Sequence, residues 1–233
     1  PHLVRPVRFL FPLTHRFWER LYVGAGVWLY DSIGGKRVLP RHRHLSRATA
    51  LAEFPALRDD ALIGGIQYFD AQVDDARHTM MLARSAAQCG AVVATSVRAV
   101  GFDKANGQVT GVRARCLETG ESFEISAKQV INATGVWTEG VHGMAGGGHL
   151  RVRASKGVHL LVDRDRIHAD SGLILRTASS VLFVIPWGAH WIIGTTDTNW
   201  ALDLDHPAAS GRDIDYLLDC VNTMLREPLC HDD

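Results

Sequence analysis

Residues 130–137, with the sequence VINATGVW, decide how the rest of this chain is interpreted. A short apolar run at 129–131 leads into the small residues Ala133, Thr134 and Gly135, a pattern typical of a buried strand that ends in a tight turn before a helix. Small residues let the backbone approach a large ligand, and free N–H groups at such a turn can face a pyrophosphate. The alternative is an ordinary strand–loop junction, so the flanking sequence has to decide between the two.

Composition limits the class of protein. The chain has 233 residues, 46% of them hydrophobic, and a formal net charge of zero. This length allows a substantial core, and the balanced charge gives no reason to expect a nucleic-acid partner. Four scattered cysteines without a CxxC pair indicate reduced thiols of a cytoplasmic protein. His42 and His44 lack a third ligand, so no metal site is expected, and no apolar run reaches the ~20 residues of a membrane span.

The first part of the chain is rich in basic and aromatic residues. From Thr14 onwards, the spacing of apolar residues predicts one or two amphipathic helices that end near the glycines at 34–35. Such a helix either lies on a membrane surface or packs against its own domain. The Gly-Ala-Gly sequence at 24–26 is not a dinucleotide fingerprint, because bulky Leu29 holds the third glycine position and no acidic residue lies near His44.

The middle of the chain has the pattern of an incomplete nucleotide-binding domain. A strand is predicted at 64–70 and a strong helix at 76–88 that ends at Gly90. Two hairpin turns, Asn106-Gly107 and Thr119-Gly120, separate the strands that follow. These three strands are predicted at 92–100, 109–117 and 123–131.

After a glycine-rich loop, the pattern changes to short β-rich runs at 151–162, 171–175, 181–186 and 190–194. These runs predict an antiparallel sheet in a second domain, with one face open to a ligand. A last helix is predicted at 213–226. The expected parts are an N-terminal helical segment (1–60), part of a cofactor domain (61–145), a substrate or cap domain (146–205) and the start of a further helical segment (206–233).

Five sequence blocks, in this order, resemble the FAD-dependent (respiratory) glycerol-3-phosphate dehydrogenases. They are YFDAQVDDAR at 68–77, NATGVW at 132–137, SKGVH at 155–159, FVIPW at 183–187 and IIGTTD at 192–197. The blocks cover most of residues 60–200. The NATG sequence alone would mark only the wider superfamily of flavin-dependent amine oxidases.

The resemblance implies an α/β (mixed α+β) flavoprotein, with a partial FAD-binding Rossmann-like domain and an antiparallel β-sheet cap over the substrate. The implied reaction is oxidation of sn-glycerol 3-phosphate to dihydroxyacetone phosphate, with electrons passed from FAD to a quinone. It also implies a cytoplasmic enzyme, peripheral on the inner face of the cell membrane, and allows a homodimer. The family's GxGxxG segment and GVRP-like block are missing, so we expect an internal fragment of a longer enzyme.

On the substrate side, the resemblance makes His159 the candidate acid/base, because oxidation of an alcohol requires a group that accepts the hydroxyl proton. Lys156, Thr195 and Thr196 are the candidate substrate-binding residues. The alternatives are a histidine that is satisfied within the fold and a plain turn at residues 194–197.

On the cofactor side, the resemblance assigns Ala133, Thr134 and Gly135 to a backbone approach to FAD, and Val97 to a backbone contact with adenine. Trp137 is also a candidate cofactor-binding residue, although we expect it to pack against the FAD domain rather than to stack on the flavin. Two rival functions stay open at this point. One is another FAD-dependent oxidase of the amino-acid oxidase-like superfamily, and the other is a truncated polypeptide without catalysis.

Overall fold

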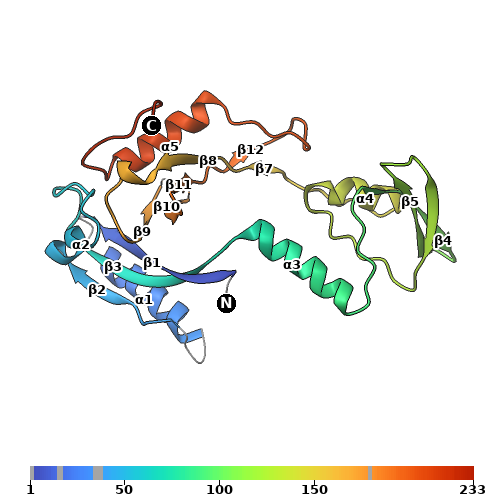
Figure 1. The fold of residues 1–233 in the computed structure, drawn as a ribbon, viewed down its shortest axis with the longest axis horizontal. Helices are drawn as coiled ribbons and strands as arrows, with labels where there is room; N and C mark the ends of the chain where they lie inside the picture. The colour runs from blue at the N-terminus through green and yellow to red at the C-terminus, as the bar shows by residue number, and fades with distance from the viewer. Residues whose placement is uncertain (1–2, 15–17, 34–38, 178–179) are drawn as a thin grey trace. The chain divides into compact units, whose positions relative to one another are not determined.

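The structure is a computed structural model that describes residues 3–14, 18–33, 39–177 and 180–233 (Figure 1). The chain divides into two compact units, which are described separately. Unit 1 comprises residues 1–75, 156–198 and 208–233, and unit 2 comprises residues 76–155 and 199–207. The mixture of helices and strands agrees with the expected α/β class. The N-terminal stretch and the predicted cap strands, which we expected in separate parts, belong to the same unit.

Unit 1 is built on a seven-stranded sheet with the strand order β2-β3-β1-β9-β10-β11-β8. Its strands are β1 (Val4–Leu13), β2 (Arg43–Ser46), β3 (Gly64–Val73), β8 (His159–Asp163), β9 (Gly172–Arg176), β10 (Val181–Trp187) and β11 (His190–Gly194). Every neighbouring pair is antiparallel except β1 and β9, which are parallel. The predicted antiparallel cap strands are therefore present, and the N-terminal residues extend their sheet.

Strand β1 corrects the expectation that residues 1–60 form a helical segment. It pairs along its full length with β3 and meets β9 on its other side. Val7 and Phe9 are buried on one face of the sheet, while Leu10 is buried on the other. Because both faces are covered, the polar–apolar alternation that marks a half-exposed strand is absent, and the sequence pattern did not reveal it.

The main core lies on the face of the sheet that carries α2 (Arg47–Glu53) and α5 (Gly211–Asn222). Phe54 and Trp191 are both fully buried there, with ring centroids 6.2 Å apart. The opposite face has a smaller cluster around Phe9, whose ring stacks on that of Tyr68 at 6.0 Å. The sheet therefore holds a deep core on one side and a shallow aromatic surface on the other.

The helices of unit 1 begin where the sequence supplies caps. The Ser46 side chain accepts the Thr49 N–H at the start of α2, and Ser210 and Asp213 form a capping box at the start of α5. Helix α1 (Glu19–Ile33) confirms that this part of the chain is helical, and the predicted end at 34–35 lies outside the described residues. It contains residues 24–26, which confirms that this Gly-Ala-Gly sequence is not a phosphate-binding loop.

Unit 2 contains α3 (Asp75–Gln88), η1 (Gly135–Trp137), α4 (Thr138–Met144) and a three-stranded antiparallel sheet of β4 (Val97–Ala105), β5 (Gln108–Cys116) and β6 (Ser122–Ser126). The predicted helix at 76–88 is confirmed, and Gly90 beyond it has a φ of 94°. The hairpin at Asn106-Gly107 is also confirmed, with positive φ at both residues, as a tight two-residue turn requires.

Two strand predictions in unit 2 are wrong at their ends. The strand expected at 92–100 begins only at Val97, and the strand expected at 123–131 ends at Ser126. Residues 127–134 have no helical or strand assignment, and Ile131 is 79% exposed. A buried strand requires neighbours that pair with its N–H and C=O groups, and none of the described residues pairs with this segment in a strand.

The remaining short elements are η2 (Arg164–Arg166) and the two-stranded pair β7 (Ser155–Lys156) and β12 (Thr198–Asn199). Both strands of this pair lie where the chain passes from one unit to the other. The last helix was predicted at 213–226, but α5 begins and ends slightly earlier.

Candidate active site

The predicted catalytic histidine lies at the first position of β8, directly opposite Gly194 of β11. The His159 side chain is exposed, whereas Val158 before it is buried. A Cβ atom at position 194 would overlap the His159 ring. The ring therefore lies close against the backbone of the neighbouring strand, and the missing side chain at Gly194 makes room for it.

Thr195 and Thr196 follow Gly194 and point to different surroundings. Thr195 is exposed, and its hydroxyl donates to the Thr196 carbonyl at 3.0 Å. Thr196 is 4% exposed, and its hydroxyl accepts the Val158 N–H at 3.0 Å. Of the two predicted substrate-binding threonines, only Thr195 has a side chain that a ligand can reach without rearrangement of unit 1.

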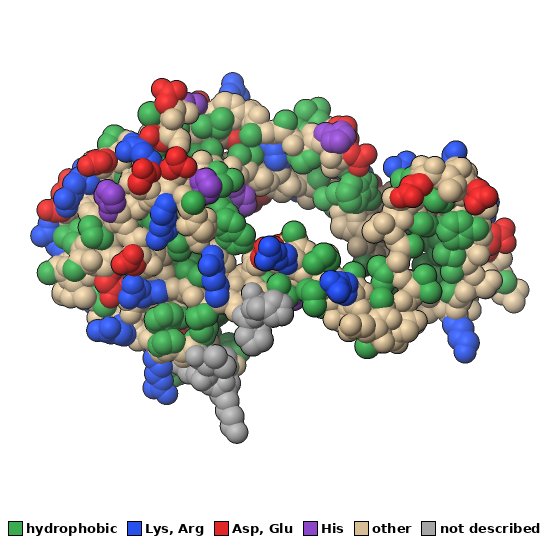
Figure 2. Space-filling model, in the orientation of Figure 1, with side chains coloured by type: hydrophobic (Ala, Val, Ile, Leu, Met, Phe, Trp, Pro, Cys, Tyr) green, Lys and Arg blue, Asp and Glu red, His purple; other side chains and the backbone are tan. Residues whose placement is uncertain are grey.

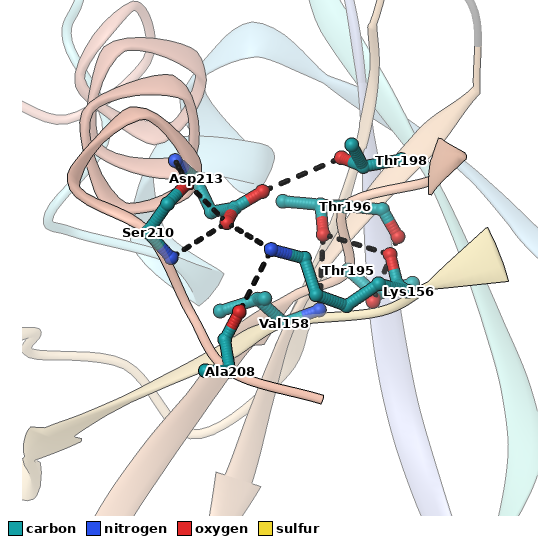
Figure 3. A network of polar contacts seen from close by, with 8 residues as sticks. All are labelled: Lys156, Val158, Thr195, Thr196, Thr198, Ala208, Ser210 and Asp213. Carbon is teal, nitrogen blue, oxygen red and sulfur yellow. Dashed lines mark hydrogen bonds and ion pairs between the residues drawn. The ribbon is translucent and has the colours of Figure 1, made fainter. Parts of the chain in front are cut away.

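Lys156 differs most from its expected surroundings, because its ammonium group lies in a buried ion pair (Figure 3). Its Nζ lies 2.6 Å from Asp213 Oδ2, and both side chains are 6% exposed. The same Nζ donates to the Ala208 carbonyl at 2.8 Å. A lysine held in this way contributes to the fold, and its burial argues against the direct substrate contact that the sequence predicted.

Asp213 is the acceptor at the centre of this network. Besides Lys156, the Ser210 N–H and hydroxyl donate to its Oδ2 at 2.8 and 2.6 Å, and the Thr198 hydroxyl donates to Oδ1 at 3.3 Å. The hydrogen bonds from Lys156 and then Ser210 hold the pKa of the Asp213 carboxyl well below its usual range. The carboxylate is therefore ionised at neutral pH.

Sequence reasoning missed Asp213 as a partner of Lys156. The pattern Ser210-x-x-Asp213 is the sequence signature of a capping box, and it predicts a helix start. It contains no information about a lysine 57 residues earlier in the chain. Only the packing of α5 next to the sheet brings the two charges together.

In unit 2, the predicted cofactor loop is held by the side chain of Asn132. Its Oδ1 accepts the Thr134 hydroxyl at 2.6 Å, and its Nδ2 donates to the Thr138 carbonyl at 3.1 Å. Gly135 has a φ of 57°, a conformation that favours glycine. Ala133 and Gly135 are exposed, and no atom lies within 4 Å of a Cβ built at Gly135. The loop is thus a tight turn of small residues with open space beside it, which fits a backbone approach to FAD.

The other two cofactor candidates also lie in unit 2. Val97 is the half-buried first residue of β4 and pairs with Cys116. Trp137 is 51% exposed, and its indole N–H donates to Asp205 at 3.1 Å. Both residues belong to unit 2, and the exposed part of the Trp137 ring leaves its expected packing against the FAD domain a prediction. In the described part of the chain, no group of three or more His, Cys, Asp or Glu could hold a metal ion.

Comparison with known proteins gives this arrangement a family. A family model described as "FAD dependent oxidoreductase" matches residues 6–232. The protein "Glycerol-3-phosphate dehydrogenase" of Mycobacterium leprae is 55% identical over 234 residues, which cover 100% of this chain and 40% of the relative. The human mitochondrial protein of that name is 35% identical over 234 residues, which cover 97% of this chain and 32% of the relative.

Among solved structures, glycerol-3-phosphate dehydrogenase from Bacillus halodurans, complexed with FAD, matches with a TM-score of 0.82 and 30% identity. The match covers 100% of this chain and 42% of that structure. The chain thus spans about two fifths of the mycobacterial relative and of this structure. These matches confirm the resemblance that the five sequence blocks indicate. Because the family model covers nearly all of it, the chain belongs to the FAD-dependent oxidoreductase family.

Proposed function

We propose that this chain is the central part of an FAD-dependent dehydrogenase that oxidises sn-glycerol 3-phosphate to dihydroxyacetone phosphate. The observation that carries the proposal is the 55% identity to the Mycobacterium leprae glycerol-3-phosphate dehydrogenase along the whole chain. The FAD-bound structure from Bacillus halodurans supports it with a fold match over the same length. The proposal concerns a family-length enzyme, by which we mean this chain joined to the flanking regions of the Mycobacterium leprae relative.

Oxidation of a secondary alcohol removes a hydride from carbon and a proton from the hydroxyl group. FAD, when bound, supplies the hydride acceptor. We assign the proton to a ring nitrogen of His159, because this side chain is exposed and lies against Gly194 at the end of β11. An imidazole fixed in this way can accept a proton without a conformational search.

We assign a substrate contact to Thr195, which is exposed and whose hydroxyl lies beside Gly157. A Cβ atom at Gly157 would lie 2.6 Å from Thr195 Oγ1, so glycine at this position leaves room for the hydroxyl. Thr196 and Lys156 lie beneath this surface, and their proposed role is to support it.

For the cofactor, we assign the turn formed by Ala133, Thr134 and Gly135 to the backbone contact with FAD. Two observations support this assignment, the exposure of the small residues and the Asn132 side chain that fixes the turn. A preformed turn does not lose backbone freedom when it binds, and its N–H groups can face phosphate oxygens. Val97 and Trp137 stay candidate contacts with the adenine and with the domain around it.

We further propose that the enzyme is cytoplasmic, that a quinone accepts its electrons, and that it lies on the inner face of the membrane. The membrane location is supported by α1, which exposes Leu21, Tyr22, Trp28 and Ile33, each at least 63% accessible. Figure 2 shows a group of hydrophobic side chains at the place that α1 occupies in the same view in Figure 1. A helix with such a face can lie in a membrane interface. None of the helices in the described part of the chain has the length and apolar character needed to cross a bilayer. A homodimer is part of the same proposal.

Anaerobic mixing of the family-length enzyme with one substrate at a time tests the reaction. Glycerol 3-phosphate should bleach the flavin absorbance within the mixing experiment, whereas glycine, L-proline and other amino acids should leave it unchanged. Bleaching by an amino acid, without any effect of glycerol 3-phosphate, would replace this proposal by the amino-acid oxidase alternative. A preparation without bound flavin would contradict both readings.

A further inference from the structure

The hydroxyl of Thr196 joins two segments of unit 1 directly before the candidate catalytic residue (Figure 3). It accepts the Val158 N–H at 3.0 Å and donates to the Lys156 carbonyl at 3.3 Å. The Thr196 N–H donates to the Val158 carbonyl at 3.4 Å. All three residues are less than 10% exposed. Beyond the last pair of β8 and β11, His159 with Gly194, the buried hydroxyl and N–H of Thr196 therefore hold the segment that leads into His159 against the segment that follows β11.

The same two segments are anchored on one carboxylate. Lys156 reaches Asp213 Oδ2 from the first segment at 2.6 Å, and Thr198 reaches Oδ1 from the second at 3.3 Å. Asp213 is itself fixed in the capping box with Ser210 at the start of a 12-residue helix. A carboxylate with these partners cannot rotate without breaking several buried hydrogen bonds, so it is a rigid anchor.

The position of the His159 ring depends on the distance between the two segments, because the ring lies in close contact with Gly194. The His159 ring lies so near Gly194 that a methyl group there would overlap it, and Thr195 Oγ1 lies equally near Gly157. A shift between the two strands would change the contact on which the ring rests.

From these contacts we infer that Thr196, held by the Lys156–Asp213 pair, is a positioning residue for His159. The inference rests on the proposed function of His159 in the dehydrogenase. Thr196 does not touch the substrate, and its hydroxyl acts by fixing the strand spacing that orients the imidazole. Lys156 then has a role in the reaction without binding the substrate, which explains how it can be buried.

Thr196→Val in the family-length enzyme is the direct test, because valine has the shape of threonine without the hydroxyl. We expect the limiting rate of flavin reduction by glycerol 3-phosphate to fall by up to about 100-fold, the loss associated with a misplacement of about 1 Å. The concentration of substrate at half-maximal rate should change little. Thr196→Ser keeps the hydroxyl and should restore the rate close to that of the parent.

A second readout follows the histidine itself. The enzyme is labelled with carbon-13 in its histidine rings and studied by proton–carbon NMR. The His159 signal is the one that is missing from the spectrum of His159→Ala. In the parent enzyme this ring should give one sharp signal. Thr196→Val should broaden or split this signal, and Thr196→Ser should not. This measurement does not depend on turnover, so it separates a moved ring from any other cause of a lower rate.

Val221→Ala is the matched control for stability, because Val221 is fully buried in α5 and takes no part in the network. It should lower the melting temperature while the reduction rate and the His159 signal stay as in the parent. Suppose that Thr196→Val leaves both the reduction rate and the His159 signal unchanged, while His159→Ala slows reduction. The positioning role of Thr196 is then wrong, and the catalytic role of His159 stands. If His159→Ala does not slow reduction, the catalytic assignment of His159 fails, and the positioning role fails with it.

Discussion

Substitution of Lys156 by methionine removes one partner of an ion pair whose two side chains are each 6% exposed. Asp213 would keep its hydrogen bonds from Ser210 and Thr198 but lose a charge-assisted bond and the neutralising charge. Loss of one partner of a buried pair costs about 3–5 kcal/mol. Because Ser210 still satisfies the carboxylate, we expect the lower end of this range, about 3 kcal/mol.

Urea unfolding of the 233-residue chain, followed by circular dichroism, measures this loss. With a slope of about 2 kcal/mol per molar urea, the midpoint should fall by about 1.5 M. Arg58→Met is the matched control, because its pair with Asp60 has a similar length of 2.8 Å but side chains that are 46% and 72% exposed. An exposed pair contributes little to stability, because water screens the two charges. A shift for Lys156→Met no larger than that for Arg58→Met would refute the reasoning.

The same pair predicts the sign of a pH effect. The pKa of Asp213 is lowered in the folded state by Lys156 and Ser210, so the unfolded chain binds the proton more readily. The contribution of the pair is complete above the ordinary carboxyl pKa of about 3.9 and is lost as the pH falls through the lower folded value. The difference in stability between the parent and Lys156→Met should therefore narrow below about pH 4.

Three further changes test other parts of the structure. In the family-length enzyme, His159→Ala should slow flavin reduction by about 10²–10⁴-fold with unchanged FAD content, and an unaltered rate would make His159 a bystander. Thr134→Arg should abolish FAD binding, because a long cation at the turn blocks the backbone approach, and full flavin absorbance in the purified variant would contradict this. Partial desolvation, and then the charges of His42 and Arg20, lower the pKa of the solvent-exposed His44, so the unfolded chain takes up that proton first and stability falls slightly as the pH drops below about 6.5. His44→Gln should flatten this dependence of the urea midpoint between about pH 7 and pH 5, and an unchanged slope would show that His44 does not contribute.

Local signals in the sequence predicted the elements that depend on local chemistry. The helical sequence at 76–88 and Gly90 beyond it predicted α3, and Asn106-Gly107 predicted the turn between β4 and β5. The sequence blocks with a known order identified the family. These features require no knowledge of distant residues, because helix caps and two-residue turns are set by neighbouring φ and ψ values.

Features that depend on distant residues were not predictable. Strand β1 reads as a basic–aromatic stretch, and only its pairing with β3 and β9 makes it a strand in the interior of the sheet. The expected strand at 123–131 is the opposite case, in which the sequence predicts a strand that is absent at its end. Its apolar run at 129–131 has no pairing neighbour and stays irregular. The burial of Lys156, in strand β7, also depends on Asp213 of helix α5. In each case the missing information is tertiary, and sequence periodicity does not contain it.

The parallel pairing of β1 with β9 has a consequence for synthesis on the ribosome. Phe9 and Leu10 pair with Gly172 and Leu173, so β1 cannot gain its second neighbour until about 160 more residues have been made. At roughly 5–20 residues per second, this wait lasts on the order of 8–30 s. Once β3 has been made, the antiparallel β1–β3 pair exposes an edge of the kind that pairs with other chains until β9 arrives. Unit 2, whose main segment is continuous in sequence, can fold in the meantime. Nascent-chain experiments should therefore find that this edge binds chaperones and is released once residues 172–176 leave the exit tunnel.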